Sequence, residues 1–185
     1  MRIFWDTEFT GLHKDTTLIS LGMVADNGKE FYAEFTDFDP WQVDDWVQEH
    51  VLDNLLFNEV EEPFVRILGA ETFVKGDIHH IRTALEDWLN RFDMIELWSD
   101  CHHYDVVLLQ GIFGGAFSIP DHIYYIPFDI STAFKVYGID PDISREAFID
   151  SPISGEKHNS LYDARVIQAC YEKLRRNKYK YQLML

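Results

Sequence analysis

The chain has 185 residues, 46% of them hydrophobic, which is enough for one domain with a substantial core. Its formal net charge of −16 excludes a protein that follows a long phosphate backbone through lysine and arginine contacts. No apolar run approaches membrane-spanning length and the N-terminus leads directly into a predicted strand, so we expect no signal peptide, no membrane partner and a cytoplasmic location.

The first predicted strand, residues 2–9, carries two carboxylates within an apolar run, Asp6 and Glu8. Because alternate residues of a strand share a face, these two side chains point to the same side. Two like charges on a buried strand repel each other and lose hydration, and a divalent cation between them would relieve both costs. The alternative is a surface strand with solvated acids, and this pair alone does not decide between the two.

The elements that follow mix strands and helices. Strands are predicted near residues 17–25 and 30–36, with Asn27-Gly28 as the hairpin turn between them. Residues 57–76 have no clear pattern. The other predicted elements are helices near 41–56, 77–92, 105–113, 129–137 and 160–176 and strands near 95–98 and 123–127. This order predicts an α/β fold with a mixed five-stranded sheet flanked by helices, in a single domain over residues 1–185.

Aromatic and histidine side chains outside these motifs are predicted to be structural. Four tryptophans fall within predicted amphipathic helices or strands, where core packing is the expected role: Trp5, Trp46, Trp88 and Trp98. The pairs His79-His80 and His102-His103 have no usable ligand spacing, and we leave them outside the site.

A third acidic residue, Asp105, begins the helix after the strand at 95–98, a place where an aspartate is commonly only a cap. Cys101 and the two histidines after it raise a zinc-site alternative, but no second cysteine or histidine pair stands at ligand spacing. The two cysteines of the chain, Cys101 and Cys170, fit a reducing compartment and are expected to pack as small apolar groups.

The last helical pattern begins at Asn159 or Ser160, and either residue can cap it. Asp163 then lies in the first turn and His158 just outside the helix. These two side chains can converge only if the histidine comes from the incoming loop, because residues five apart on a continuous helix point in different directions. The alternative is a capping-box variant, Ser160-x-x-Asp163, in which the carboxylate serves the helix dipole alone.

Taken in order, Asp6-Thr7-Glu8, Tyr104-Asp105 and His158 with Asp163 resemble the three motifs of the DEDDh, or DnaQ-like, 3′-to-5′ exonuclease superfamily. Four further segments resemble the small bacterial and phage 3′-to-5′ exoribonucleases of mycobacterial type: residues 18–22, 28–33, 46–52 and 95–98. The resemblance extends over nearly the whole chain. It implies a ribonuclease H-like fold.

The resemblance also implies the chemistry of the site. Two Mg²⁺ or Mn²⁺ ions would be held by the four acids Asp6, Glu8, Asp105 and Asp163, since such ions prefer hard oxygen ligands. His158 would take the proton from the attacking water. The implied reaction releases nucleoside 5′-monophosphates from RNA 3′ ends, single-stranded overhangs among them, and the subfamily makes a homodimer an expectation.

The first motif continues into a segment that resembles the one receiving the terminal nucleotide in DNA-proofreading relatives. By that resemblance Leu12 packs on the terminal base and the Thr10 region meets its 3′ hydroxyl, although Leu12 can equally be an ordinary loop hydrophobe. The full set of implied substrate-binding residues is Thr7, Phe9, Thr10, Gly11, Leu12 and Tyr104. The chain departs from the superfamily at Asp100, where an asparagine is usual, so the strand contacts of that asparagine are not carried over.

The long loop before His158 and the basic C-terminal segment are two further candidate functional regions. Residues 138–157 are predicted as a loop that orders His158 when substrate and metal are present. The basic C-terminal residues 173–180 either guide a strand by charge and stacking or form a solvated helix end. The alternative functions are a 3′-to-5′ exodeoxyribonuclease of phage or prophage type and a non-catalytic module that binds nucleic-acid ends. The presence of all four acids and the histidine disfavours the module.

Overall fold

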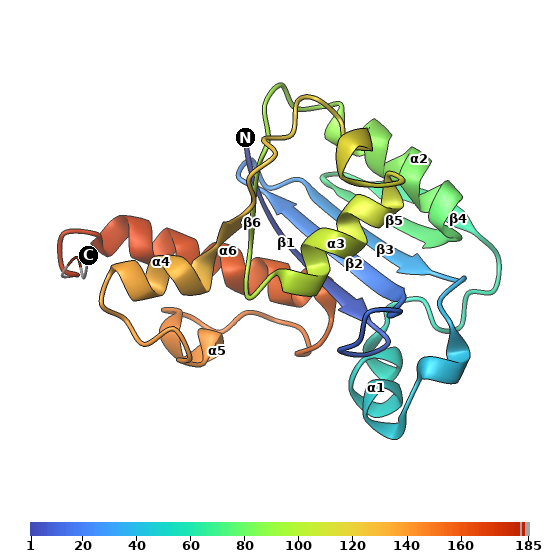
Figure 1. Ribbon diagram of the computed structural model, residues 1–185, viewed down its shortest axis with the longest axis horizontal. Helices are drawn as coiled ribbons and strands as arrows, with labels where there is room; N and C mark the ends of the chain where they lie inside the picture. Colours follow the sequence, from blue (N-terminus) through green and yellow to red (C-terminus); the bar gives the residue numbers. More distant parts are fainter. Residues whose placement is uncertain (182, 184–185) are drawn as a thin grey trace.

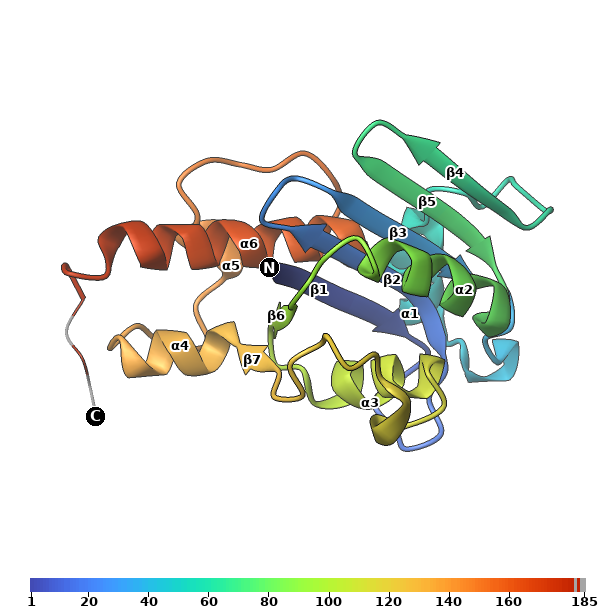
Figure 2. The ribbon, with the colours of Figure 1, turned by 90° about the horizontal axis from the view of Figure 1, so that it is seen from above.

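The computed structural model describes residues 1–181 and 183 and arranges them as a mixed sheet between two layers of helices (Figures 1 and 2). The sheet has seven strands in the order β4-β5-β3-β2-β1-β6-β7. The strands are β1 (Arg2–Phe9), β2 (Leu18–Ala25), β3 (Glu30–Phe35), β4 (Phe64–Leu68), β5 (Glu71–Gly76), β6 (Glu96–Ser99) and β7 (Phe128–Asp129). The α-helices are α1 (Asp45–His50), α2 (Ile78–Leu89), α3 (His103–Ile112), α4 (Ile130–Val136), α5 (Arg145–Phe148) and α6 (Ser160–Asn177).

The opening strand β1 lies in the interior of the sheet, antiparallel to β2 and parallel to β6. Its odd-numbered residues Ile3 and Trp5 join the core cluster shared with α2 and α3. Phe4 belongs to the cluster on the opposite face, against α6. The predicted alternation along this strand is therefore correct, and Figure 2 shows β1 running between α6 and α3.

A glycine in β2 allows α6 to approach the sheet closely. Gly22 is the register partner of Asp6. A Cβ atom added at Gly22 would lie 2.3 Å from the backbone of Ser160 and Leu161, so any larger residue would push the start of α6 away. The first turn of α6 therefore lies directly on β2, beside the position of Asp6 in β1.

The sheet has two more strands than the sequence pattern predicted. The missing strands, β4 and β5, form in residues 57–76, where no pattern was evident. β4 is an edge strand with exposed residues, and β5 pairs in parallel with β3, which is distant in sequence. β4 therefore lacks the apolar alternation that marks a half-buried strand. β5 does bury alternate residues, but of Thr72, Val74 and Gly76 only Val74 is a large apolar residue.

Three other predicted elements differ in extent. The helix predicted over 41–56 is broken into η1 (Pro40–Gln42), α1 and η2 (Leu52–Asn54), because Asp44 caps α1 and accepts a hydrogen bond from the Val47 N–H at 2.8 Å. The strand predicted over 123–127 is reduced to one bridge at Ile123 and the two-residue β7. The loop at 138–157 contains the short helix α5.

None of the helices among residues 1–181 and 183 combines the length and apolarity needed to cross a bilayer. Cys170 is fully buried, as predicted for a small apolar group, whereas Cys101 is exposed, so that the prediction for Cys101 is wrong.

Candidate active site

Four carboxylates from three elements converge where β1 ends. Asp6 and Glu8 come from β1, Asp163 from the first turn of α6 and Asp105 from the first turn of α3. In Figure 1 the end of β1 meets the starts of α3 and α6 at this point. Together with Asp100, the four acids line one cavity of about 470 Å³. The arrangement concentrates negative charge in one confined place.

His158 joins the acids from the loop side, as predicted. Ligand atoms of Glu8, His158 and Asp163 lie within 4.8 Å of one another. The His158 backbone has a φ of 63°, which is uncommon for a residue other than glycine. Its N–H donates to Asp163 Oδ2 at 2.9 Å, and this bond holds the unusual conformation. The histidine and the aspartate are thus fixed to each other across the start of α6.

The helix cap is Asn159 rather than Ser160. The Asn159 side chain accepts from the Tyr162 N–H at 3.3 Å, while the hydroxyl of Ser160 is hydrogen-bonded to Ser20 at 2.9 Å. With Asn159 as the cap, the Asp163 carboxylate accepts from the N–H of His158, the residue before the cap, whereas the N–H of Asn159 donates to the Glu156 carbonyl oxygen. The alternative of a Ser160-x-x-Asp163 capping box is therefore wrong, and the Asp163 carboxylate is joined to the residue that precedes the helix.

Asp105 is held by the backbone and side chain of β1. Its Oδ1 atom accepts from the Thr7 N–H at 3.1 Å and from the Thr7 hydroxyl at 2.6 Å. Thr7 is 4% exposed, so its side chain orients Asp105 and has no free surface for a substrate. This differs from the predicted substrate-binding role of Thr7.

Burial and mutual repulsion raise the pKa values of the clustered acids. The pKa of Asp6 is raised well above its ordinary range, chiefly by burial and then by the charge of Glu8. Burial, with the charges of Asp163 and Asp105, raises the pKa of Glu8 to about 8. Burial likewise raises the pKa of Asp163 to about 7 and that of Asp105 above its ordinary value. Such a cluster favours protons or cations, and its hard oxygen donors suit Mg²⁺ or Mn²⁺.

Basic side chains face the acids across the cavity. Arg145 and Lys157 line it beside His158. Burial lowers the pKa of His158, and the neighbouring charges of Lys157 and His50 lower it further. The imidazole therefore favours its neutral form, which can accept a proton.

A second cavity of about 450 Å³ adjoins the first through the shared residues Glu8 and Phe9. It is lined by Leu12, which is 79% exposed, and by Trp46. Its size and apolar character suit a nucleobase. Thr10 also lines this cavity, but it is only 2% exposed and its hydroxyl donates to Gln42 Oε1 at 2.5 Å. The Thr10 side chain is therefore occupied within the protein.

Trp46 was missed by the sequence reasoning, which predicted it as core. It is 49% exposed and stacks on His50 with ring centroids 4.8 Å apart and an interplanar angle of 9°. Its ring also meets His158 edge-on at 5.0 Å. The spacing of Trp46 and His50, four residues apart on one helix, is the signal that could have paired them. The remaining predicted residue, Tyr104, stacks on Phe9 at 5.5 Å and lines neither cavity.

Asp100, the departure from the superfamily pattern, is paired with Arg145. Arg145 Nε donates to Asp100 Oδ2 at 2.6 Å and Nη2 donates to Asp100 Oδ1 at 2.9 Å. The same guanidinium also donates to the carbonyl oxygens of Pro141 and Ile143. This ion pair ties the loop around α5 to the end of β6.

The structure also bears on the zinc-site alternative at Cys101 and on the basic segment near the C-terminus. Across residues 1–181 and 183, Cys101, His102 and His103 do not form a cluster of three metal ligands. Three of the basic residues near the C-terminus make ion pairs within the protein, Lys173 and Arg176 with Asp150 and Arg175 with Glu172. These pairs favour the structural explanation of that basic segment over strand guidance.

Known proteins resemble this chain in sequence and in fold. The family model of the 3′-5′ exoribonuclease Rv2179c-like domain matches residues 61–174, a segment that contains Asp105, His158 and Asp163. Two proteins of Mycobacterium tuberculosis, the 3′-5′ exoribonucleases Rv2179c (strain H37Rv) and MT2234.1 (strain CDC 1551), are each 36% identical over 122 residues. The matched segment is 65% of this chain and 66% of each relative, just under two thirds of their length.

Solved structures share the fold at low sequence identity. The nuclease domain of 3′hExo, a DEDDh family member bound to rAMP, has a TM-score of 0.65 at 11% identity and covers 100% of this chain and 96% of its own. S. pombe Pop2p in its Mg²⁺- and Mn²⁺-bound form has a TM-score of 0.65 at 12% identity, covering 96% and 84%. A 3′-exonuclease described as recognising a histone mRNA stem-loop has a TM-score of 0.66 at 11% identity, covering 98% and 84%. The predicted ribonuclease H-like fold is confirmed.

Proposed function

The chain belongs to the family of 3′-5′ exoribonuclease Rv2179c-like domains, and from this premise we propose that it is a metal-dependent 3′-to-5′ exoribonuclease releasing nucleoside 5′-monophosphates. The observation that carries the proposal is the convergence of Asp6, Glu8, Asp105 and Asp163 with His158 around one cavity. These five groups do not stabilise the fold by themselves, because their burial and repulsion destabilise the folded chain unless a cation joins them.

The four acids are proposed to hold two Mg²⁺ or Mn²⁺ ions. When bound, such ions neutralise charge on a phosphodiester, lower the pKa of water and stabilise the departing oxygen. Thr7 orients Asp105, and the His158 N–H orients Asp163, so two of the four carboxylates are fixed by hydrogen bonds before any ligand arrives. This preorganisation lowers the cost of assembling the site.

His158 is proposed as the general base that accepts the proton of the attacking water at a ring nitrogen. Its lowered pKa favours the neutral imidazole that this role requires. The ring sits beside Glu8 and Asp163 on one side and against the edge of Trp46 on the other. Substrate bound near Trp46 would therefore pack close to His158, the proposed general base.

The cavity between Leu12 and Trp46 is proposed to receive the terminal nucleobase. Leu12 offers an exposed apolar surface, Trp46 offers a ring, and Phe9 connects this cavity to the acids. Gly11 and the backbone of Thr10 line the same cavity and are proposed to meet the sugar. Tyr104 would act through its stacking contact with Phe9.

RNA is the proposed substrate because both curated relatives carry the name of exoribonucleases. The alternative of an exodeoxyribonuclease makes a different prediction for the same assay. We do not propose a homodimer, since nothing in the relatives or in this chain supports one.

The test uses 5′-labelled RNA and DNA oligonucleotides of the same sequence with Mg²⁺, Mn²⁺ or a chelator. Stepwise shortening of RNA from the 3′ end that needs metal and is lost in Asp6→Asn supports the proposal. The control is Asp93→Asn, which removes a charge from an exposed position outside the site. Faster shortening of DNA would favour the exodeoxyribonuclease. Intact oligonucleotides under every metal condition, with retained binding, would favour the non-catalytic module.

A further inference from the structure

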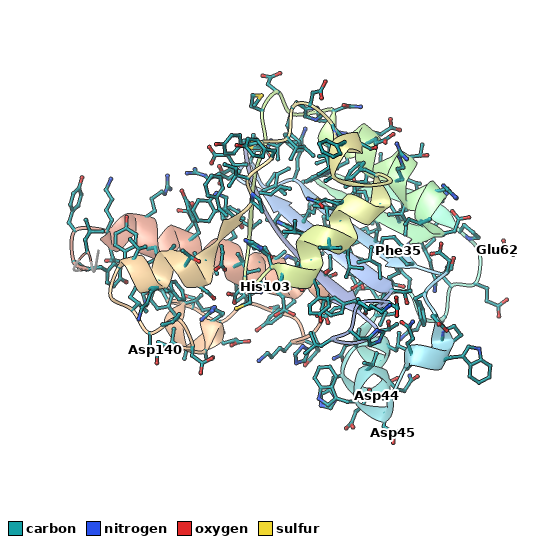
Figure 3. All side chains as sticks on the ribbon, viewed as in Figure 1. Phe35, Asp44, Asp45, Glu62, His103 and Asp140 are labelled. Atoms are coloured by element: carbon teal, nitrogen blue, oxygen red, sulfur yellow. The ribbon has the colours of Figure 1, made fainter. Side chains whose placement is uncertain are left out.

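A third cavity, of about 420 Å³, lies beside the catalytic cavity at the β6–β7 side of the sheet. Its lining includes Trp98 and Phe128 from the two strands and His102 and His103 from the start of α3. Figure 3 places His103 in front of the sheet at the start of α3. These side chains were predicted to lie outside the site, and the proposed chemistry does not use them.

The third cavity neighbours the catalytic one along the segment between β6 and α3, without sharing a lining residue with it. Cys101 lines the catalytic cavity, and the next residue, His102, lines the third. The Cys101 N–H donates to Asp129 Oδ1 at 3.1 Å, and Asp129 also lines the third cavity. The Leu12–Trp46 cavity joins the catalytic cavity through Glu8 and Phe9, whereas the third cavity approaches it at Cys101.

Aromatic rings continue outward from this third cavity. Trp98 stacks on Phe128 at 4.9 Å and 19°, and Phe128 stacks on Tyr124 at 6.0 Å and 21°. Tyr124 in turn contacts Tyr125 at 5.4 Å. Tyr124 is 40% exposed and Tyr125 is 79% exposed, so the outer end of this series offers ring surface to solvent. We call Trp98, Phe128, Tyr124 and Tyr125 the aromatic row.

The electrostatic setting of the row selects among possible ligands. The cavity lining has no lysine or arginine, and its single carboxylate, Asp129, already accepts hydrogen bonds from Cys101, Ser131 and Thr132. A chain with a net charge of −16 cannot hold an RNA strand by neutralising many phosphates. Stacking of bases on aromatic rings supplies affinity without cationic side chains.

We propose that the aromatic row is a stacking site for unpaired bases on the 5′ side of the scissile phosphate. The inference rests on the proposed exoribonuclease function, because the direction of the strand follows from placing the terminal base at Leu12 and Trp46. The strand then leaves the acids past Cys101 and His102 and meets the exposed rings of Tyr124 and Tyr125, which Phe128 and Trp98 support from within the protein. The His103 ring, held by a 3.0 Å contact between Nδ1 and the Cys101 carbonyl oxygen, lies along this path. Longer single-stranded RNA should therefore bind better than a dinucleotide.

The test compares a dinucleotide with a heptanucleotide RNA as substrates of wild type and Tyr125→Ala. Loss of one stacked base is expected to lower the heptanucleotide-to-dinucleotide ratio of kcat/KM by about 5-fold or more. Tyr125→Phe retains the ring and should restore the ratio. Phe117→Ala, which removes a fully exposed aromatic side chain outside the row, should keep the wild-type ratio.

A heptanucleotide with abasic positions on its 5′ side provides the matching change in the substrate. Wild type should lose the same factor with this substrate, and Tyr125→Ala should lose little more. An unchanged ratio in Tyr125→Ala, or an equal loss on both lengths, would overturn the proposal. A wild-type dimer that Tyr125→Ala converts to a monomer would assign the row to contacts between copies and would also overturn it.

Failure of the proposed function has a different signature. If wild type cleaves neither RNA, fluorescence anisotropy of the labelled heptanucleotide in the same buffer measures the stacking site directly. Weaker binding by Tyr125→Ala than by wild type and Phe117→Ala would then support the stacking site without nuclease activity. Equal binding by all three would reject both.

Discussion

The two sides of the catalytic cavity are built differently. The acidic side, formed by Asp6, Glu8, Asp105 and Asp163, comes from a central strand and the first turns of two long helices. The loop side is formed by Arg145 and Lys157, which line the cavity, and by Trp46 and His50, whose rings lie against His158. These residues come from short helices and connecting segments: α1, α5 and the residues before α6. Regular elements fix groups for chemistry, while loops carry the residues that meet a particular substrate. Changes on the acidic side should therefore abolish turnover, and changes on the loop side should mainly alter binding.

Asp6→Asn tests the acidic side with the largest expected effect. The substitution removes one of the four proposed metal-binding carboxylates, and kcat should fall by about 10³-fold or more because metal binding is lost. The same change relieves repulsion with Glu8, so the metal-free variant should melt at a higher temperature than wild type. Kinetics with Mg²⁺ and thermal melting in chelator measure the two effects. Lower stability in chelator would contradict the proposed repulsion.

His158→Ala tests the group that lies between the two sides. Loss of a general base typically lowers the rate by about 10²–10⁴-fold, and we expect an effect on kcat in this range with little change in KM. His50→Ala is the matched control, since His50 also stacks on Trp46 but does not line the cavity that holds the acids. An equal loss of kcat in both variants would mean that His158 acts by supporting Trp46.

Trp46→Ala tests the loop side. Removing the ring should raise KM by about 10-fold, in line with roughly 1–3 kcal/mol for a stacked base, and should change kcat less. Trp41→Ala is the control because Trp41 is 95% exposed and lines none of the three cavities. Kinetics on a short RNA measure both constants. A fall in kcat with an unchanged KM would mean that Trp46 contributes to turnover and not to binding. The proposed difference between the acidic side and the loop side would then be wrong.

The acidic side could be predicted from the sequence more fully than the loop side. Asp6 and Glu8 could be placed on one face because a strand has a fixed period of two, and the helix cap placed Asp163 and His158. Arg145 pairs with Asp100 across 45 residues, and no local pattern encodes that contact. β5 was missed although it forms a local hairpin with β4, because its buried residues Thr72, Val74 and Gly76 include only one large apolar side chain. The exposure of Trp46 depends on how α1 meets the rest of the chain.

The pH dependence of stability should reveal the acidic side without any substrate. A carboxyl whose pKa is raised by folding keeps its proton in the folded chain at pH values where the unfolded chain has lost it. The metal-free protein is therefore most stable in acid, and it should lose stability as the pH rises from about 4, where unfolded carboxyls titrate. The loss should continue to about 8, the pKa of Glu8.

Thermal melting in chelator between pH 5 and pH 8 measures this loss, which should lower Tm by about 5 °C or more. Added Mg²⁺ should restore Tm at the high-pH end, because it replaces the missing protons. A flat profile in chelator would mean that the four acids do not repel one another in the folded chain.

Asp100→Asn has the smallest expected effect and tests to which side of the cavity Asp100 belongs. Both carboxylate oxygens of Asp100 accept hydrogen bonds from Arg145, and an asparagine amide would direct a donor at this guanidinium. The pair is partly exposed, with side-chain exposures of 14% and 21%, so we expect a loss of about 1–2 kcal/mol in stability. Loosening of the loop around α5 should raise KM by roughly 2- to 5-fold, the equivalent of up to about 1 kcal/mol, with kcat nearly unchanged. Higher activity in Asp100→Asn would instead mean that Asp100 repels the substrate phosphate despite Arg145, and Asp100 would then belong to the acidic side.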